Sequence, residues 1–126
     1  DGVLVPGDHG TTYGGNPLAG AAVNAVFDQF EKLDLVAHVQ EVGSYLWDKL
    51  EELKNEFSFI TAHRGAGLMQ GLEFSSEKQA EQIVSKALSN GLILISAGNN
   101  VLRFVPPLVI EKENVDLMTE KLRASF

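Results

Sequence analysis

The feature that constrains this chain most is a long stretch of apolar residues spaced three and four positions apart, beginning just after Asp34. The stripe consists of Leu35, Val39, Val42, Leu46, Leu50, Leu53 and Phe57. Most charged residues of the same stretch lie off the stripe. This spacing predicts an amphipathic surface helix that begins at an Asp34 cap and runs to about Asn55. With 126 residues, the chain is long enough for one domain with a core and too short for two ordinary ones.

A glycine-rich stretch at residues 9–17 stands just before a second apolar segment. It holds two adjacent threonines, three glycines and the pair Asn16-Pro17. Asn16 suits a helix N-cap and Pro17 suits the first helical turn, so a helix is predicted from Pro17 to Leu33. The first half of that helix is apolar nearly all round, and such a helix is normally buried on several sides. We therefore expect its partner surface to lie outside the small domain that this chain forms.

The remaining elements follow from periodicity and from turn residues. Strands are expected over 59–63 and 68–74, joined through Gly65 and Gly67, followed by a helix from Ser76 to Asn90 with a Ser76/Gln79 capping box. Strands over 92–96 and 101–105 should then flank a turn at 98–100. A last helix should carry Val115, Met118, Leu122 and Phe126. The apolar run at 92–96 indicates a central strand. The order α-α-β-β-α-β-β-α predicts an α+β domain with a small antiparallel sheet that carries helices on one face.

Composition and residue spacing exclude several classes of site and partner. The formal net charge of −7 argues against nucleic acid and against anionic membranes. No apolar run approaches the roughly 18 residues that span a bilayer. The absence of cysteine excludes disulfides and thiolate metal sites and agrees with a reducing cytoplasm. His9, His38 and His63 are far apart in the sequence, so no metal site is expected.

Three short strings of this sequence resemble, in the same order, the signature sequences of one enzyme family. They read HGTTYGGNPLA at residues 9–19, RGAGLMQGLE at 64–73 and LRFVPPL at 102–108. The resemblance is to the class III aminotransferases, which use pyridoxal phosphate, and it is closest to the acetylornithine and ornithine aminotransferase branch. The three strings span most of the chain, but they match only the C-terminal part of such an enzyme.

The resemblance implies that the family's Schiff-base lysine, and the aspartate that pairs with the pyridinium nitrogen of the cofactor, lie upstream of Asp1. We therefore expect a C-terminal fragment of a pyridoxal-phosphate-dependent aminotransferase that has no catalytic residue of its own, does not retain the cofactor and is inactive in isolation. Its expected fold is the C-terminal small domain of a fold-type I enzyme. Residues 1–16 are expected to form a lead-in and phosphate-contacting loop, and residues 17–126 the small domain, which includes an interdomain helix at 17–33.

Arg103 is the candidate residue for binding substrate. Along its predicted strand it shares a face with Val101 and Val105, opposite Leu102 and Phe104. An arginine in a half-exposed strand is commonly a solvent-facing charge. The alternative is a carboxylate clamp, because a guanidinium group presents a planar pair of donors that fits a carboxylate. The resemblance favours the clamp, since the arginine of the family's matching motif binds the substrate carboxylate.

Thr12 and Thr11 are the candidate residues on the glycine-rich loop. Glycines, hydroxyls and backbone N–H groups near the start of a helix suit a phosphate, whereas local turn bonds to the backbone are the alternative for both threonines. The resemblance implies that Thr12 binds the cofactor phosphate and that the loop reaches into the active site of a neighbouring subunit, so that a homodimer completes each site. Thr11 occupies a position where the family often has serine and where substrate is contacted.

The resemblance also implies a specific activity. It points to a cytoplasmic N-acetylornithine:2-oxoglutarate aminotransferase of arginine biosynthesis, with the large cofactor-binding domain of the same chain and a second subunit as partners. Ornithine, succinylornithine and 4-aminobutyrate stay open as amino donors. A function of another class is a stand-alone α+β module that binds a small acid through Arg103 without catalysis. The apolar helix at 17–33 argues against that module, because a free-standing domain would present a polar outer face there.

Overall fold

The computed structural model describes residues 3, 5, 7–98 and 100–126. Predictions that concern Asp1, Gly2, Leu4 and Pro6 in the lead-in, and Asn99 in the turn, lie outside the described residues. The chain divides into two compact units, residues 1–35 and 36–126, and each is described by itself. The predicted division into residues 1–16 and 17–126 stays a prediction.

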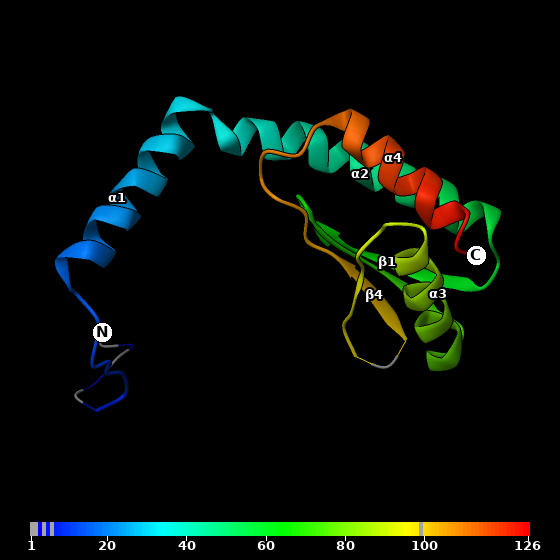
Figure 1. Cartoon of the computed structure of the whole chain (residues 1–126), viewed down its shortest axis with the longest axis horizontal. Coiled ribbons are helices and arrows are strands. Elements are labelled where there is room, and N and C mark those ends of the chain that lie inside the picture. Colours follow the sequence, from blue (N-terminus) through cyan, green and yellow to red (C-terminus); the bar gives the residue numbers. More distant parts are fainter. Residues whose placement is uncertain (1–2, 4, 6, 99) are drawn as a thin grey trace. The chain divides into compact units, whose positions relative to one another are not determined.

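The described elements follow the predicted order (Figure 1). They are α1 (Pro17–Lys32), α2 (Leu35–Glu56), β1 (Ile60–Ala66), β2 (Met69–Phe74), α3 (Glu77–Ser89), β3 (Ile95–Ser96), β4 (Val101–Phe104) and α4 (Lys112–Arg123). The prediction of an α+β fold is confirmed. The strand over 59–63 is longer than predicted, because β1 continues through Gly65 to Ala66.

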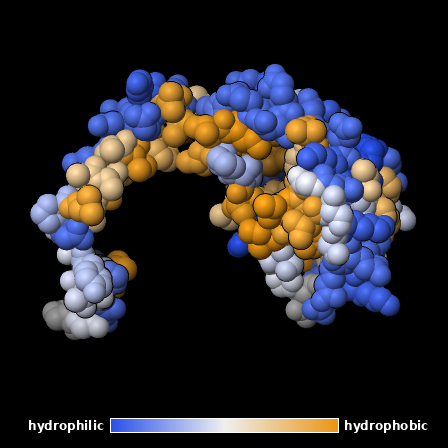
Figure 2. All heavy atoms as spheres, in the orientation of Figure 1, coloured by the Kyte–Doolittle hydropathy of each residue, from blue (hydrophilic) through white to orange (hydrophobic). Residues whose placement is uncertain are grey.

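In the first unit, α1 begins as its sequence predicts. The Asn16 Oδ1 atom accepts a hydrogen bond of 2.9 Å from the N–H of Ala19, and Pro17 occupies the first turn. No residue of α1 is buried, and its large apolar side chains are exposed, including Leu18 at 80% and Phe27 at 65%. Figure 2 shows hydrophobic residues, coloured orange, at the surface of this helix. This exposure agrees with the prediction that α1 packs against a surface outside its own unit.

The chain leaves α1 through Asp34, which does not cap α2 as predicted. Asp34 has a φ angle of 45°, and its N–H donates to the carbonyl of Glu31 at 3.2 Å. An N-cap residue instead has an extended backbone. The short polar side chain of aspartate tolerates the left-handed conformation better than most residues do, and this residue ends the first helix rather than starting the second.

In the second unit, the four strands form one antiparallel sheet in the order β1-β2-β4-β3. The prediction that residues 92–96 form a central strand is wrong. Only Ile95 and Ser96 are in the strand, and they pair with β4 alone, at the edge of the sheet. Ile93 is 81% exposed, whereas Leu92 and Leu94 pack against the core. Residues 92–94 are apolar on both sides of the segment, but the core covers only the side that carries Leu92 and Leu94.

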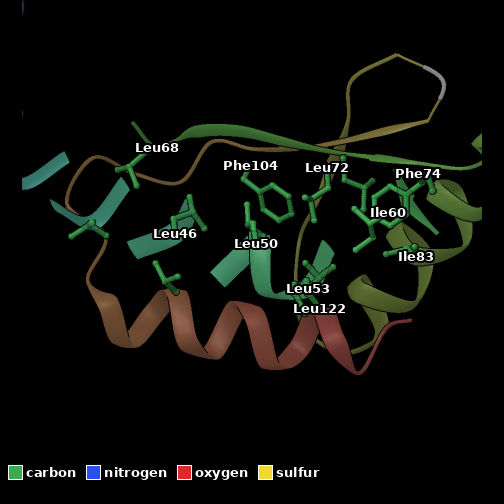
Figure 3. Packing of buried hydrophobic residues seen from close by; sticks show 14 residues of the cluster. Leu46, Leu50, Leu53, Ile60, Leu68, Leu72, Phe74, Ile83, Phe104 and Leu122 are labelled. Atoms are coloured by element: carbon green, nitrogen blue, oxygen red, sulfur yellow. The ribbon is translucent and has the colours of Figure 1, made fainter. Parts of the chain in front are cut away.

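The two faces of the sheet differ in the way that alternation along the strands predicts. One face carries Leu72 paired with Leu102, and Gln70 paired with Phe104, all of them buried. The helices α2, α3 and α4 also contribute residues to the same core. Figure 3 shows Leu46, Leu50, Leu53, Ile83 and Leu122 directed toward Leu72, Phe74 and Phe104. The predicted sheet with helices on one face is confirmed, and its other face is left open by the helices of this unit.

The β1–β2 hairpin closes against α2 through two glycines. Ala66 and Met69 form the last strand pair, so Gly67 and Leu68 make a two-residue turn. Gly67 has a φ angle of 54°, which suits the first position of a type II′ turn. A Cβ atom added at Gly43 of α2 would lie 2.7 Å from the carbonyl carbon of Gly67. The helix and the turn therefore touch backbone to backbone.

The shorter helices begin and end largely as predicted. At the start of α3, Ser76 Oγ accepts from the N–H of Gln79 at 3.3 Å, and the hydroxyl of Ser75 donates to Gln79 Oε1 at 3.0 Å. The same helix ends with Asn90 as its C-cap, as predicted. No serine or threonine precedes α4, where the N–H of Glu111 instead donates to Asn114 Oδ1 at 3.2 Å.

Candidate substrate-binding site

Arg103 lies on the open face of the sheet. Its neighbours in β4, Leu102 and Phe104, are 0% and 5% exposed and point into the core, whereas Arg103 itself is exposed. Directly across from Arg103 are Gly71 of β2 and Ile95 of β3. Among the described residues, no hydrogen bond or ion pair engages the guanidinium group of Arg103. Its donors are available to a ligand.

A second arginine lies in the same row of the open face. Arg64 of β1 pairs with Gly71, which therefore stands between the two arginines. The guanidinium group of Arg64 donates to Glu73 Oε2 at 2.6 Å, and 62% of its side chain is exposed. Arg64 therefore forms a surface salt bridge. The charge of Arg64 is compensated by a carboxylate, so Arg103 is the arginine of this row that suits an added anion.

Two pockets meet at Arg103. One, of about 390 Å³, lies on the open face between the β1–β2 hairpin and β4, and Gly65, Met69, Gly71 and Val101 contribute to its wall. The other, also of about 390 Å³, lies between the segment at 92–95, β4 and α4, and its lining is almost entirely apolar. A guanidinium group at the edge of an apolar pocket suits a small molecule with one carboxylate and an aliphatic part.

Thr11 and Thr12 lie in the first unit, in the loop before α1. Both are exposed, and within the described part of the chain neither hydroxyl forms a hydrogen bond. The nearby loop is ordered by the Asn16 side-chain amide, which donates to the carbonyl of Tyr13 at 2.6 Å. Among the described residues, neither threonine side chain forms the local turn bonds that were considered as an alternative. Arg103 belongs to the second unit, and the roles of all three residues stay predictions.

The residues of this chain fit part of what pyridoxal phosphate needs. Two exposed hydroxyls in a glycine-rich loop offer neutral donors to a phosphate group. Five of the seven lysines already have polar partners: Lys49, Lys54 and Lys112 lie beside carboxylates, and Lys86 and Lys121 donate to backbone carbonyls. A lysine that forms a Schiff base instead needs an apolar pocket or a cationic neighbour that depresses its pKa.

A polar network lies on the covered side of the sheet and was not predicted from the sequence. His63 and Gln70 point inward there, toward Glu51 and Trp47 of α2. The sequence did indicate that the Gln70 side chain points inward, because Gln70 shares the alternating inward face with Leu68 and Leu72. A buried amide requires hydrogen-bond partners. Those partners come from elements that the alternation of one strand does not identify.

No group of three or more histidine or acidic residues in the described part of the chain is arranged to hold a metal ion. No helix of the described ranges is both long and apolar enough to cross a bilayer.

Comparison with known proteins supplies the family context for this arrangement. The aminotransferase class-III family model matches residues 2–126. The acetylornithine aminotransferase of Aquifex aeolicus is 46% identical over 121 residues, which are 95% of this chain and 30% of that protein. The acetylornithine aminotransferase of Methanocaldococcus jannaschii is 43% identical over 120 residues, again 95% of this chain and 30% of that protein.

Solved structures agree with the fold. Acetylornithine aminotransferase from Elizabethkingia anophelis matches with a TM-score of 0.86 and 29% identity, over 97% of this chain and 31% of that one. Lysine aminotransferase from M. tuberculosis matches in fold with a TM-score of 0.88, at 24% identity, over 97% of this chain and 28% of that one. This confirms the expected fold of a fold-type I aminotransferase domain. The chain spans about 30% of the length of these relatives, and it belongs to the class III aminotransferase family.

Proposed function

We propose that this chain is the C-terminal domain of a pyridoxal-phosphate-dependent aminotransferase that transfers the amino group of N-acetylornithine to 2-oxoglutarate. One observation carries the proposal. Arg103 is exposed, has no ion-pair partner among the described residues, and lies beside a pocket on the open face of the sheet. Relatives that are 43–46% identical and named acetylornithine aminotransferase support the choice of amino donor.

The residues of this chain contribute binding and orientation to that reaction. Pyridoxal phosphate, when bound, supplies the electron sink for amino transfer. Arg103 holds the substrate carboxylate through two parallel N–H donors, which fixes the position of the amino group. Thr12 donates a hydrogen bond to the cofactor phosphate, and Thr11 contacts substrate. The lysine that the reaction requires comes from the large domain of the same chain.

The proposal extends to the assembly and the setting of the enzyme. The exposed apolar residues of α1 pack against the large domain of the same chain. A second subunit receives the loop that carries Thr11 and Thr12, so the active form is a homodimer. The enzyme acts in the cytoplasm, in arginine biosynthesis.

The test uses the complete protein that carries this sequence, with amino transfer to 2-oxoglutarate measured for several donors. We expect N-acetylornithine to give the highest kcat/KM among N-acetylornithine, ornithine, succinylornithine and 4-aminobutyrate. We expect the 126-residue chain alone to give no turnover and to retain no cofactor absorbance. Turnover by the isolated chain, or a complete protein that binds small acids without amino transfer, would overturn the proposal.

Substitution of Arg103 in the complete protein tests its assigned role. Loss of hydrogen bonds to a charged group costs about 1.5–3 kcal/mol, so Arg103→Ala should lower kcat/KM roughly ten- to a hundredfold. Arg103→Lys should recover part of the loss, because lysine keeps the charge but not the planar fork. Arg123→Ala removes a surface arginine that pairs with Glu56 and serves as the control. An equal effect of Arg103→Ala and Arg123→Ala would contradict the carboxylate clamp.

A further inference from the structure

The histidine ring of β1 is enclosed between the sheet and α2. The side chain of His63 has no exposed surface, and its ring stacks on Trp47 with 3.9 Å between the centroids. The Nδ1 atom lies 2.9 Å from Glu51 Oε1, and the Nε2 atom lies 3.1 Å from Gln70 Oε1. Both ring nitrogens therefore face an oxygen atom of another side chain.

The orientation of the Gln70 amide is fixed by two backbone carbonyl groups. The Nε2 atom of Gln70 donates to the carbonyl of Gly43 at 2.9 Å and to that of Gly67 at 2.7 Å. A carbonyl oxygen only accepts, and a reversed amide would place its own oxygen against both carbonyls. The amide oxygen must then face His63. Because this oxygen also only accepts, the Nε2 atom of His63 must carry a proton.

The other side of the ring faces a carboxylate that favours its ionised form. Glu51 also accepts from Lys54 Nζ at 3.1 Å. Burial acts to raise the pKa of the Glu51 carboxyl group, but the hydrogen bonds from Lys54 and His63 outweigh burial, so the pKa lies below its usual value. An ionised carboxylate has no proton to donate, so the Nδ1 atom of His63 must carry one as well.

We propose that His63 is a positioning residue that carries protons on both ring nitrogens and, through Gln70, holds the Gly67-Leu68 turn of the β1–β2 hairpin against α2. The network starts at Glu51 and ends on the backbone of Gly43 and Gly67. The same hairpin forms one wall of the pocket beside Arg103. The proposal concerns the folded chain itself and does not depend on the proposed enzymatic activity.

Nitrogen-15 NMR of the histidine rings in the 126-residue chain tests the proposal directly, at about pH 7.5, where a free imidazole is mostly neutral. We expect both ring nitrogens of His63 to show the resonance of a protonated nitrogen. His38 is the internal reference. Among the described residues only its Nε2 atom has a hydrogen-bond partner, the carbonyl of Ile110 at 2.9 Å, for which one ring proton suffices. An unprotonated nitrogen on the His63 ring would overturn the proposal.

Denaturant unfolding provides a second, independent test. His63→Gln should unfold at a lower denaturant concentration than wild type and than the control His38→Gln, because it removes the hydrogen bonds to Glu51 and Gln70. Equal midpoints for His63→Gln and His38→Gln would overturn the proposal. If His63→Gln does not fold, the NMR measurement on wild type still decides.

Discussion

At the scale of single residues, position 43 has no room for a side chain. A Cβ atom at Gly43 would lie within 2.7–2.9 Å of three backbone atoms of Gly67. Backbone atoms cannot turn aside as a flexible side chain can. The turn would have to move away from α2, and with it the two carbonyl groups that orient Gln70.

Gly43→Ala should therefore lower the free energy of unfolding by about 1–3 kcal/mol, the usual cost of overpacking. Gly20→Ala is the matched control, because Gly20 is also helical and a Cβ atom there meets nothing within 4 Å. Alanine favours a helix by up to about 1 kcal/mol over glycine, so this control should be neutral or stabilising. Urea unfolding followed by circular dichroism measures both, and equal midpoints for the two variants would contradict the prediction.

Residue patterns predicted the direction of side chains better than their partners. Alternation in β4 placed Arg103 opposite the core residues Leu102 and Phe104, and the structure agrees. Alternation in β2 also places Gln70 inside the core. Its partner Gly43 lies 27 positions away in another element, however, and a single-sequence pattern carries no record of that contact. The site could be predicted at the level of one strand but not across the sheet.

At the scale of elements, α1 is the helix whose apolar surface is least covered. Leu18, Val23, Val26 and Phe27 are each more than half exposed in its unit. Apolar surface of this kind drives association in water, at about 25 cal/mol per Å² that becomes buried. The isolated 126-residue chain should therefore self-associate through α1.

Sedimentation of the isolated chain at several concentrations measures this association. Phe27→Glu should shift the chain toward the monomer, because a buried carboxylate in the contact would be unpaired. Leu117→Glu is the control, since Leu117 of α4 is 50% exposed but lies on a different helix. If both variants associate as wild type does, α1 is not the contact.

Among the elements, helices were predicted more closely than strands. A stripe of seven apolar residues gave α2 to within a few residues of its observed ends. The apolar run at 92–96 misled, because an uninterrupted run suits both a strand covered on two faces and an edge segment whose outer side is bare. Which one forms depends on what covers Ile93, and the chain itself does not supply that cover.

At the scale of the whole molecule, polar contacts between α2 and α4 contribute to the response to acid. Lys112 Nζ lies 2.5 Å from Glu41 Oε1, and the hydroxyl of Tyr45 donates to Asp116 at 2.6 Å. The hydrogen bond and charge of Lys112 lower the pKa of the Glu41 carboxyl group. A carboxyl group whose folded pKa lies below its unfolded value stabilises the fold above the unfolded value and loses that contribution as pH falls.

Wild type should therefore lose stability as pH falls below about 4.5, the usual value for glutamate. In Lys112→Ala this loss should be smaller, and an NMR titration should find the pKa of Glu41 closer to its usual value. The pair is exposed, so the change in stability should be small and should shrink further in high salt. Lys78→Ala, on α3, is the control. If the pKa of Glu41 is the same in Lys112→Ala as in wild type, Lys112 is not what lowers it.

The strand order β1-β2-β4-β3 divides the sheet into two hairpins that meet where β2 pairs with β4. Each hairpin closes a short loop, a step that takes roughly 1–10 μs in isolated peptides. The β2–β4 pairing encloses all of α3, so it carries a larger loop-closure entropy and should form after both hairpins. That pairing is also the one that sets Gly71 beside Arg103. The pocket should therefore be completed late in folding, when the two hairpins join.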